Sequence, residues 1–154
     1  MHSFGTDEYI NRIVKTYSDS LLKTAFSILR STDDAEDVVQ EVFIKLISKQ
    51  PKFNDSAHEK AWLLRVTINT AKNMLKSASK NHLPLTEEIP FSDQNADLLS
   101  VVMSLPERYR TVIHLYYYEG YSIKEIAAVL KLPAATVGTR LARARDLLKG
   151  EISE

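Results

Sequence analysis

The chain has 154 residues, of which 44% are hydrophobic, and its 20 basic and 20 acidic side chains give a net charge of zero. It contains no cysteine, which excludes a disulfide framework and thiol chemistry and fits a reducing cytoplasm. No apolar run approaches the length of a membrane span, and the charges among the first twenty residues predict no signal peptide. Because affinity for DNA grows with the number of phosphates neutralised, a chain with balanced charge is expected to bind DNA poorly without a partner.

The first predicted helix covers residues 9–29, where apolar residues recur every three or four positions. Its apolar stripe is Ile10, Val14, Tyr17, Leu21, Ala25, Ile28 and Leu29. The polar residues Ser18, Asp19 and Ser20 are the one place where this helix could be interrupted. Ser31 or Thr32 then offers an N-cap for a second helix.

The second predicted helix begins with a cluster of carboxylates, which complement the dipole of its first turns. The apolar stripe expected to be buried beyond them is Val39, Val42, Phe43, Leu46 and Ile47. One polar face carries Asp34, Asp37, Gln40 and Glu41. Helix capping and solubility explain these residues on physical grounds alone. A metal or acid–base site is disfavoured, because no histidine or cysteine lies nearby and no second helix of this kind exists to complete one.

The third predicted helix follows a break at residues 50–55, with Ser56 and Glu59 as a capping box. Between Lys60 and Lys80 there are five basic residues and no acidic one. If this helix is continuous, one face combines cations and amides, which suits contact with phosphates and base edges. This candidate nucleic-acid face consists of Arg65, Asn69, Lys72, Asn73 and Lys76. The aromatic rings of Phe53 and Trp62 could stack on an unpaired base, although single aromatic residues are more often part of a core.

Residues 79–97 contain two prolines and many small polar residues, and they are interpreted as a flexible linker between domains at residues 1–78 and 98–154. Beyond the linker, Pro106 is expected to start a helix that Gly120 ends. The four histidines are scattered, and the sequence has neither a glycine-rich phosphate loop nor a nucleophile elbow. We therefore expect no metal, no cofactor, no small-molecule substrate and no enzymatic activity.

Two short amphipathic helices meet at a corner near the end of the chain. Ser122 and Glu125 form a capping box for the first helix, and Pro133 marks the start of the second. This arrangement is typical of a helix-turn-helix whose second helix enters the major groove of DNA. The corner residue Lys131 stands where the motif often has glycine, so a left-handed backbone there would cost some strain. The outer face of the second helix carries Thr136, Thr139, Arg140 and Arg143. An ordinary helical corner with a solvated basic face is the alternative.

Three segments, in this order, resemble the RNA polymerase sigma factors of the extracytoplasmic-function type, the minimal two-domain class of the sigma-70 family. They are DAEDVVQEVFIKL (residues 34–46), AWLLRVTINTAKNML (61–75) and LPERYRTVIHLYYYEGYSIKEIAAVLKLPAATVGTRLARAR (105–145). The resemblance implies an all-α fold of two small helical domains, the second a helix-turn-helix. It also implies a cytoplasmic transcription initiation factor that binds core RNA polymerase and directs it to promoter DNA. Membrane insertion is not expected.

The resemblance further implies a role for each candidate surface. In this family the acidic helix docks on core polymerase, which would assign polymerase binding to Asp34, Asp37, Gln40 and Glu41. The minus 10 element would meet Phe53, Trp62, Arg65, Asn69, Lys72, Asn73 and Lys76, with Asn69 in a loop that captures a flipped base. The minus 35 duplex would meet Lys131, Thr136, Thr139, Arg140 and Arg143. An anti-sigma factor that clasps both domains is a further expected partner.

The sequence departs from the family pattern in the recognition helix. Gly138 stands where a basic residue is common, which removes an expected DNA contact and costs about 1 kcal/mol of helix propensity relative to alanine. Ala142 also replaces a larger side chain. The main alternative function is an autonomous helix-turn-helix repressor or activator, which would bind its duplex tightly without polymerase. A third is an interaction protein whose DNA surface has decayed. The sequence leaves the relative orientation of the two domains open.

Overall fold

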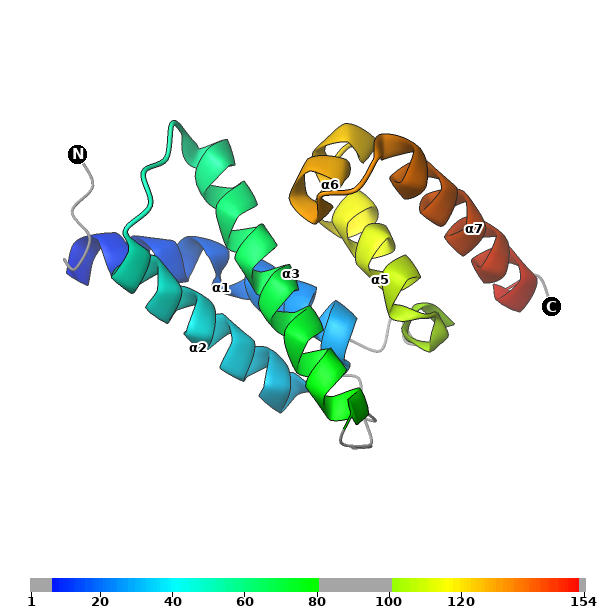
Figure 1. Ribbon diagram of the computed structural model, residues 1–154, viewed down its shortest axis with the longest axis horizontal. Coiled ribbons are helices and arrows are strands. Elements are labelled where there is room, and N and C mark those ends of the chain that lie inside the picture. Colours follow the sequence, from blue (N-terminus) through cyan, green and yellow to red (C-terminus); the bar gives the residue numbers. More distant parts are fainter. Residues whose placement is uncertain (1–6, 81–100, 153–154) are drawn as a thin grey trace.

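The computed structural model describes residues 7–80 and 101–152, and within these ranges the chain is helical with no strand. The N-terminal half consists of three long helices: α1 (Asp7–Leu29), α2 (Thr32–Lys49) and α3 (Ser56–Lys80). The C-terminal half consists of α5 (Glu107–Ile113), the π-helical segment η2 (His114–Tyr118), α6 (Ile123–Leu130) and α7 (Ala134–Ile152) (Figure 1). The predicted all-α fold is confirmed. Most of the predicted linker lies outside the described residues.

Helix α1 runs without a break through Ser18, Asp19 and Ser20, so the interruption considered from the sequence is absent. Thr24 Oγ1 donates to the carbonyl oxygen of Ser20, and the hydroxyl of Ser20 donates to Glu119 in the C-terminal half of the molecule. The buried stripe is shifted by one residue from the predicted one at its start, with Ile13 fully buried and Val14 38% exposed. The core between α1, α2 and α3 includes Leu21, Ile28, Leu46, Leu63, Leu64 and Ile68.

The N-terminus of α2 follows the sequence prediction, because the side chain of Ser31 accepts a hydrogen bond from the backbone N–H of Asp34. Its buried face is Ala35, Val38, Val39, Val42 and Leu46. The prediction that Ile47 is buried is wrong, since its side chain is 42% exposed. Consecutive helical residues point about 100° apart. With Leu46 at the centre of the buried stripe, Ile47 is turned towards solvent.

Asp55, and not a box formed by Ser56 and Glu59, caps α3. The Asp55 Oδ1 atom accepts a hydrogen bond of 2.8 Å from the backbone N–H of His58. The Glu59 side chain is instead buried against α1, where the hydroxyls of Tyr9 and Tyr17 and the guanidinium of Arg12 all donate to it at 3.0 to 3.1 Å. The predicted capping box is wrong because these three donors from α1 hold the carboxylate away from the N-terminus of α3.

Helix α3 is a single continuous helix, so Asn69 lies in its middle. The stripe of cations and amides predicted for a continuous helix therefore exists. The position of Asn69 in a loop, which the family resemblance implied, is wrong for this chain. The opposite face of α3 is buried, with Leu63, Leu64 and Ile68 in the core.

The C-terminal half contains the predicted helix-turn-helix. Both hydrogen bonds of the capping box between Ser122 and Glu125 are present at the start of α6. Lys131 adopts the left-handed conformation with φ of 57°, so the strain considered from the sequence for a corner without glycine is present, and α7 begins directly after Pro133. Gly120 has φ of 75° and lets the chain turn from η2 towards α6. Val137, Leu141 and Ala144, on the inner face of α7, are fully buried.

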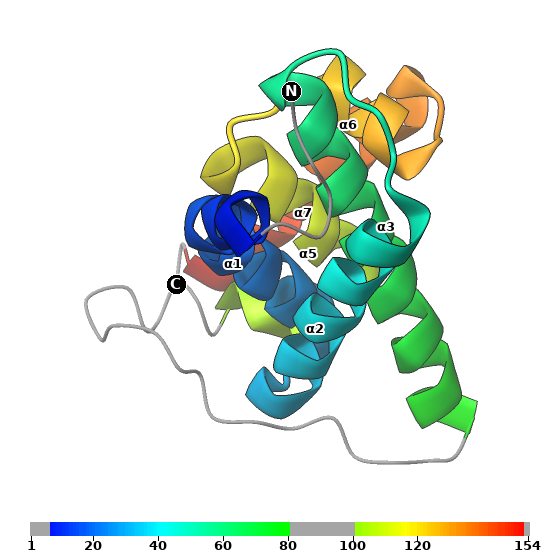
Figure 2. The same cartoon turned by 90° about the vertical axis from the view of Figure 1, so that its left-hand side faces the viewer.

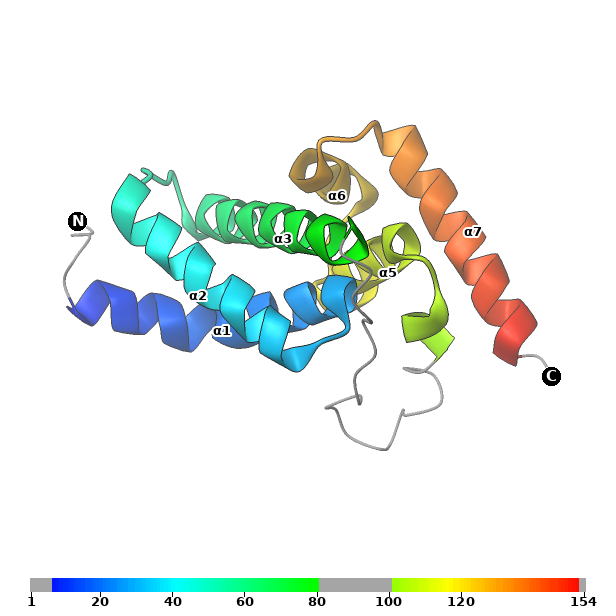
Figure 3. The ribbon, with the colours of Figure 1, turned by 60° about the horizontal axis from the view of Figure 1, so that its bottom comes forward.

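The two halves are packed against each other. Helix α5 and η2 lie on α1, and α6 lies beside α3, while α7 forms the outer edge of the molecule (Figures 1 and 3). Figure 2, viewed along α1, shows α2 on the side of the N-terminal half away from α6 and α7. This closed arrangement supplies the relative orientation that the sequence left open.

Candidate functional site

The acidic face of α2 is open to solvent. Asp37, Gln40 and Glu41 are exposed, and Asp34 is partly buried beside the N-cap. Ile44, with a side chain 63% exposed, lies on the same face one turn beyond Glu41. The face therefore combines carboxylates with a large exposed apolar side chain. Sequence reasoning missed Ile44, although its position outside the stripe of Val39, Val42 and Leu46 was a usable signal.

The candidate nucleic-acid face of α3 is divided in two by its surroundings. Asn69, Asn73 and Lys76 are exposed, whereas Arg65 and Lys72 are partly buried and contact the C-terminal half. The Arg65 Nη2 atom donates to the carbonyl oxygen of Ala128 in α6 at 3.3 Å. Lys72 Nζ lies 3.9 Å from Glu107 Oε2 at the start of α5, the outer limit of an ion pair. The structure thus brings the five residues onto one helix face but leaves only three of them open.

The two aromatic candidates lie together near the start of α3. The ring centroids of Phe53 and Trp62 are 5.9 Å apart in an edge-to-face arrangement, and Phe53 also meets the ring of His58 at 5.3 Å. Both side chains are partly buried. They pack against the core, and their role in stacking on a base stays a prediction.

The outer face of α7 carries the residues expected to read duplex DNA. Thr139 and Arg143 are exposed and Thr136 and Arg140 are partly exposed, with Lys131 exposed at the corner. Arg145 points to a different side, because its Nε donates to the hydroxyl of Tyr117 at 2.7 Å and its guanidinium lies over the ring of Tyr116. A basic face on a solvent-facing second helix is what docking into a major groove requires.

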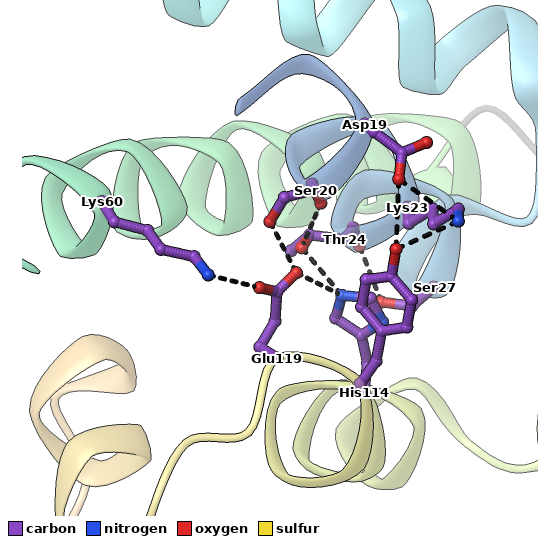
Figure 4. A network of polar contacts seen from close by, with 9 residues as sticks. Asp19, Ser20, Lys23, Thr24, Ser27, Lys60, His114 and Glu119 are labelled. Carbon is purple, nitrogen blue, oxygen red and sulfur yellow. Dashed lines mark hydrogen bonds and ion pairs between the residues drawn. The ribbon is translucent and has the colours of Figure 1, made fainter. Parts of the chain in front are cut away.

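A polar cluster that sequence reasoning missed lies between the two halves (Figure 4). Glu119, whose side chain is only 2% exposed, accepts hydrogen bonds from Ser20 Oγ at 2.6 Å and from Lys60 Nζ at 3.0 Å. His114 Nε2 lies 3.4 Å from the same carboxylate and 2.9 Å from Thr24 Oγ1. Since the one hydroxyl proton of Thr24 goes to a carbonyl, His114 Nε2 carries a proton and donates.

The surroundings of Glu119 favour its charged form. Burial raises the pKa of this carboxyl, but the hydrogen bonds from His114, Ser20 and Lys60 together outweigh that effect and lower the pKa to about 2. Glu119 is therefore a fixed negative charge in the interface between the halves. No sequence signal marked it, because its partners Ser20 and Lys60 lie in α1 and α3, far away in the chain.

A second buried charge in this interface is Arg110. Its Nε and Nη2 atoms donate to the carbonyl oxygens of Ser27 and Ile28 at the C-terminus of α1, and its Nη1 donates to that of Leu105, all at 2.6 Å. Burial lowers the pKa of Arg110 to about 10, so the side chain remains charged near neutral pH. A cation at a helix C-terminus interacts favourably with the helix dipole.

No cluster of three or more metal-binding side chains occurs among residues 7–80 and 101–152. In the same part of the chain, no helix is long and apolar enough to cross a membrane. The candidate surfaces are an acidic face on α2 and basic faces on α3 and α7, and charged helix faces suit the binding of macromolecules.

Comparison with known proteins relates both halves of the chain to the same protein family. The model of the family Sigma-70 region 2 matches residues 13–81, and that of Sigma-70, region 4 matches residues 95–148. The ECF RNA polymerase sigma-E factor of Haemophilus influenzae is 30% identical over 96% of this chain and 89% of its own length. The chain belongs to the extracytoplasmic-function RNA polymerase sigma factors. As such it is a transcription initiation factor that directs RNA polymerase to promoters, and the repressor alternative is not favoured.

Solved structures share the fold of this sigma factor. The structure of the sigma factor RpoE in complex with the anti-sigma factor NepR from Bartonella quintana matches with a TM-score of 0.77 and 23% identity, over 96% of this chain and 98% of the other. That of CnrH in complex with the cytosolic domain of CnrY matches with a TM-score of 0.72 and 26% identity, over 97% and 90%. These likenesses confirm the predicted fold.

Proposed function

We propose that the sigma factor divides promoter recognition among three helix faces. The acidic face of α2 binds core polymerase through Asp34, Asp37, Gln40 and Glu41, with Ile44 adding an apolar contact. The face of α3 meets the minus 10 element, and the outer face of α7 enters the major groove of the minus 35 element. The proposal rests above all on the exposure of an acidic face on α2 and a basic face on α7. These two helices lie at opposite ends of the molecule (Figure 1).

The roles within the minus 10 surface follow from side-chain chemistry. Arg65, Lys72 and Lys76 neutralise phosphates, while the amides of Asn69 and Asn73 contact base edges of an unpaired strand. Asn69 performs this role from the middle of a helix. Phe53 and Trp62 supply a stacking surface next to it. On this proposal, residues 1–78 and 98–154 act as separate binding domains joined at 79–97.

The chemistry of RNA synthesis belongs to the polymerase in this proposal, and the sigma factor has no catalytic group of its own. An anti-sigma factor is a further proposed partner, supported by the fold shared with a sigma factor solved with such a protein. The cytoplasm, where polymerase and promoters are found, is the proposed location.

Run-off transcription with core polymerase tests the proposed function as a whole, and the affinity of variants for core polymerase tests the role of α2. Asp37→Lys reverses an exposed charge on the α2 face and is expected to reduce binding to core polymerase at least about tenfold, since a reversed charge opposes docking. Glu8→Lys is the matched control, because Glu8 is an exposed acid on α1 outside the proposed surfaces. Unchanged binding of the Asp37→Lys protein, or equal losses in both variants, would count against the docking role of α2.

The duplex contact needs its own variant. Arg143→Ala removes an exposed cation from the outer face of α7 and is expected to lower promoter output while core binding stays unchanged. Tight, specific binding of the wild-type chain to promoter duplex without polymerase would instead support an autonomous regulator.

A further inference from the structure

Phe53 lies in the short non-helical segment, residues 50–55, that joins α2 to α3. The two ends of this segment continue the hydrogen bonding of the adjoining helices. Within the described part of the chain, residues 51–54 form a single hydrogen bond, which the backbone N–H of Asn54 donates. The position of Phe53 therefore depends on that bond and on the contacts of its own ring.

His58, in the first turn of α3, accepts the hydrogen bond from Asn54. Its Nδ1 atom lies 3.1 Å from the Asn54 nitrogen, and its ring meets that of Phe53 edge to face, with centroids 5.3 Å apart. The backbone of His58 is fixed as well, because its N–H donates to Asp55 Oδ1 at 2.8 Å. Both the side chain and the backbone of His58 are thus bound to the segment that carries Phe53.

The Phe53 ring belongs to the stacking surface proposed for the minus 10 strand. Its other aromatic neighbour is Trp62, with ring centroids 5.9 Å apart. His58 and Trp62 are four positions apart on α3 and share one face of the helix, against which Phe53 packs. Ordering a loop when a partner binds costs free energy, and a loop already held in its bound conformation avoids that cost.

We propose that His58 is a positioning residue for the minus 10 strand. By accepting the hydrogen bond from Asn54 and packing on Phe53, it holds the Phe53 ring in place before an unpaired base arrives. The proposal rests on the proposed minus 10 function of Phe53 and adds the residue that arranges this ring in advance. If the segment is ordered in only a fraction of the molecules, the apparent affinity for the strand is reduced by that fraction.

Two variants distinguish the two nitrogen atoms of the His58 ring. In His58→Asn the amide oxygen is bonded to Cγ, as Nδ1 is, so it can still accept the hydrogen bond from Asn54. In His58→Gln the amide lies one bond farther out, near the place of Nε2, which carries the proton of the neutral ring because Nδ1 accepts. His58→Leu removes both groups. Asn11→Leu, at an exposed position of α1 outside the proposed surfaces, is the matched control.

Acrylamide quenching of the fluorescence of Trp62, the single tryptophan, tests the position of the segment in the full chain without polymerase. His58 is exposed, so the variants should fold, and far-UV circular dichroism checks this. We expect the quenching constant to rise about twofold in His58→Leu and His58→Gln, because local opening of the segment uncovers Trp62. His58→Asn and Asn11→Leu should stay near the wild-type value. If all variants match the wild type, His58 does not hold the segment and the proposal is wrong.

Promoter opening tests the consequence for DNA. With core polymerase in excess, the reactivity of unpaired thymines to permanganate measures opening at a promoter that the wild type transcribes. We expect opening to fall about three- to tenfold in His58→Leu and His58→Gln and less than about twofold in His58→Asn, as for the loss of one hydrogen bond. Affinity for core polymerase should be unchanged in all variants. Opening that survives in His58→Gln but not in His58→Asn would assign His58 a direct DNA contact through Nε2 and overturn the positioning role.

The two measurements also separate this proposal from the proposed function. If quenching of Trp62 rises while opening stays at the wild-type level, the position of Phe53 does not matter to the strand and the proposal is overturned. If the wild type opens no promoter with core polymerase, the proposed function fails and the role of His58 towards DNA fails with it. The quenching result still decides whether His58 holds the segment.

Discussion

Glu59 is the single carboxylate on which Tyr9, Arg12 and Tyr17 converge, and only 3% of it is exposed. Glu59→Gln keeps its shape but removes the charge that these donors bind. Because a hydrogen bond to a charged group contributes about 1.5–3 kcal/mol, we expect the free energy of unfolding to fall by about 2–3 kcal/mol. Urea unfolding followed by the fluorescence of Trp62 measures this. The exposed control Glu8→Gln should change stability by less than about 0.5 kcal/mol, and equal stability of both variants would contradict the role of Glu59.

Glu119 should make stability depend on pH. Its pKa of about 2 in the folded chain lies below the ordinary value of 4.5, so its contribution is fully present above pH 4.5 and is lost as pH falls towards 2. The charged groups that face it are Lys60 from α3 and, when protonated, His114 from η2, and Tyr121 lies close by. At pH 6 we expect the free energy of unfolding of the wild type to be about 2–3 kcal/mol higher than that of Glu119→Gln.

Paired urea titrations of wild type and Glu119→Gln at pH 6, 4 and 3 measure this dependence. The stability difference between the two proteins should shrink across the series as the carboxylate takes up a proton. A difference that does not vary with pH would show that Glu119 stabilises the chain by shape and packing alone.

Sequence reasoning worked at the residue scale only where partners are close in the chain. Ser31 and Asp34, or Ser122 and Glu125, are three positions apart, and both caps were predicted correctly. Glu59 has the same local signature as Glu125, yet its hydrogen-bond partners Tyr9 and Tyr17 are 50 and 42 positions away. Local spacing shows that a helix starts, but it cannot show that donors from another helix will compete for the carboxylate.

At the scale of the helix, glycine at position 138 lowers the stability of the recognition helix α7. A Cβ atom added there would meet no other atom within 4 Å. We therefore expect Gly138→Ala to stabilise the chain by about 0.8–1 kcal/mol, from helix propensity alone. Gly138→Arg should also strengthen binding of the polymerase complex to its promoter and steepen the salt dependence by about one phosphate contact.

Gly150 offers a matched control for Gly138. It also lies in α7 with open space around its Cα, but near the end of the helix. Gly150→Arg adds the same charge and is expected to leave the salt dependence of promoter binding nearly unchanged. Thermal unfolding measures the stability gained by Gly138→Ala. Promoter affinity at several salt concentrations measures the salt dependence of the two arginine variants. Equal salt slopes for both arginine variants would mean that residue 138 does not face DNA.

The predicted helices show which part of the amphipathic pattern is reliable. The stripe of α2 was assigned correctly at Val42 and Leu46. The sequence placed the corner at Lys131 without fixing its backbone conformation, which the structure shows to be left-handed. Ile47 was assigned wrongly, since periodicity alone does not fix where a stripe ends. The continuity of α3 through Asn69 followed from its own periodicity, and the family pattern suggested a loop that this chain does not form.

For the whole molecule, neither composition nor periodicity could predict the closed arrangement. The contacts between the halves join residues far apart in the chain, such as Ser20 with Glu119, which are 99 positions apart. The balanced charge of the chain predicted weak binding to DNA without a partner. The structure adds that two of the available cations, Arg65 and Lys72, are already engaged within the chain.

Arg110 should couple the unfolding of the two halves. Three nitrogens of one planar guanidinium bind three carbonyl oxygens, two of them at the end of α1. Lysine keeps the charge but presents no planar fork, so Arg110→Lys is expected to weaken the interface nearly as much as Arg110→Met. The chain has a single tryptophan, Trp62 in α3, whose fluorescence reports on the N-terminal half, whereas circular dichroism at 222 nm reports on all helices.

In wild type the two signals should give one coincident urea transition, because the interface makes the halves unfold together. In both Arg110 variants we expect two transitions, with midpoints separated by about 1 M, since losing the bonds to Ser27 and Ile28 removes a few kcal/mol of coupling and urea slopes are about 1–3 kcal/mol per molar. If the transitions stay coincident in Arg110→Met, the contact with the end of α1 does not couple the halves. Glu119 and its partners would then be sufficient to keep them together.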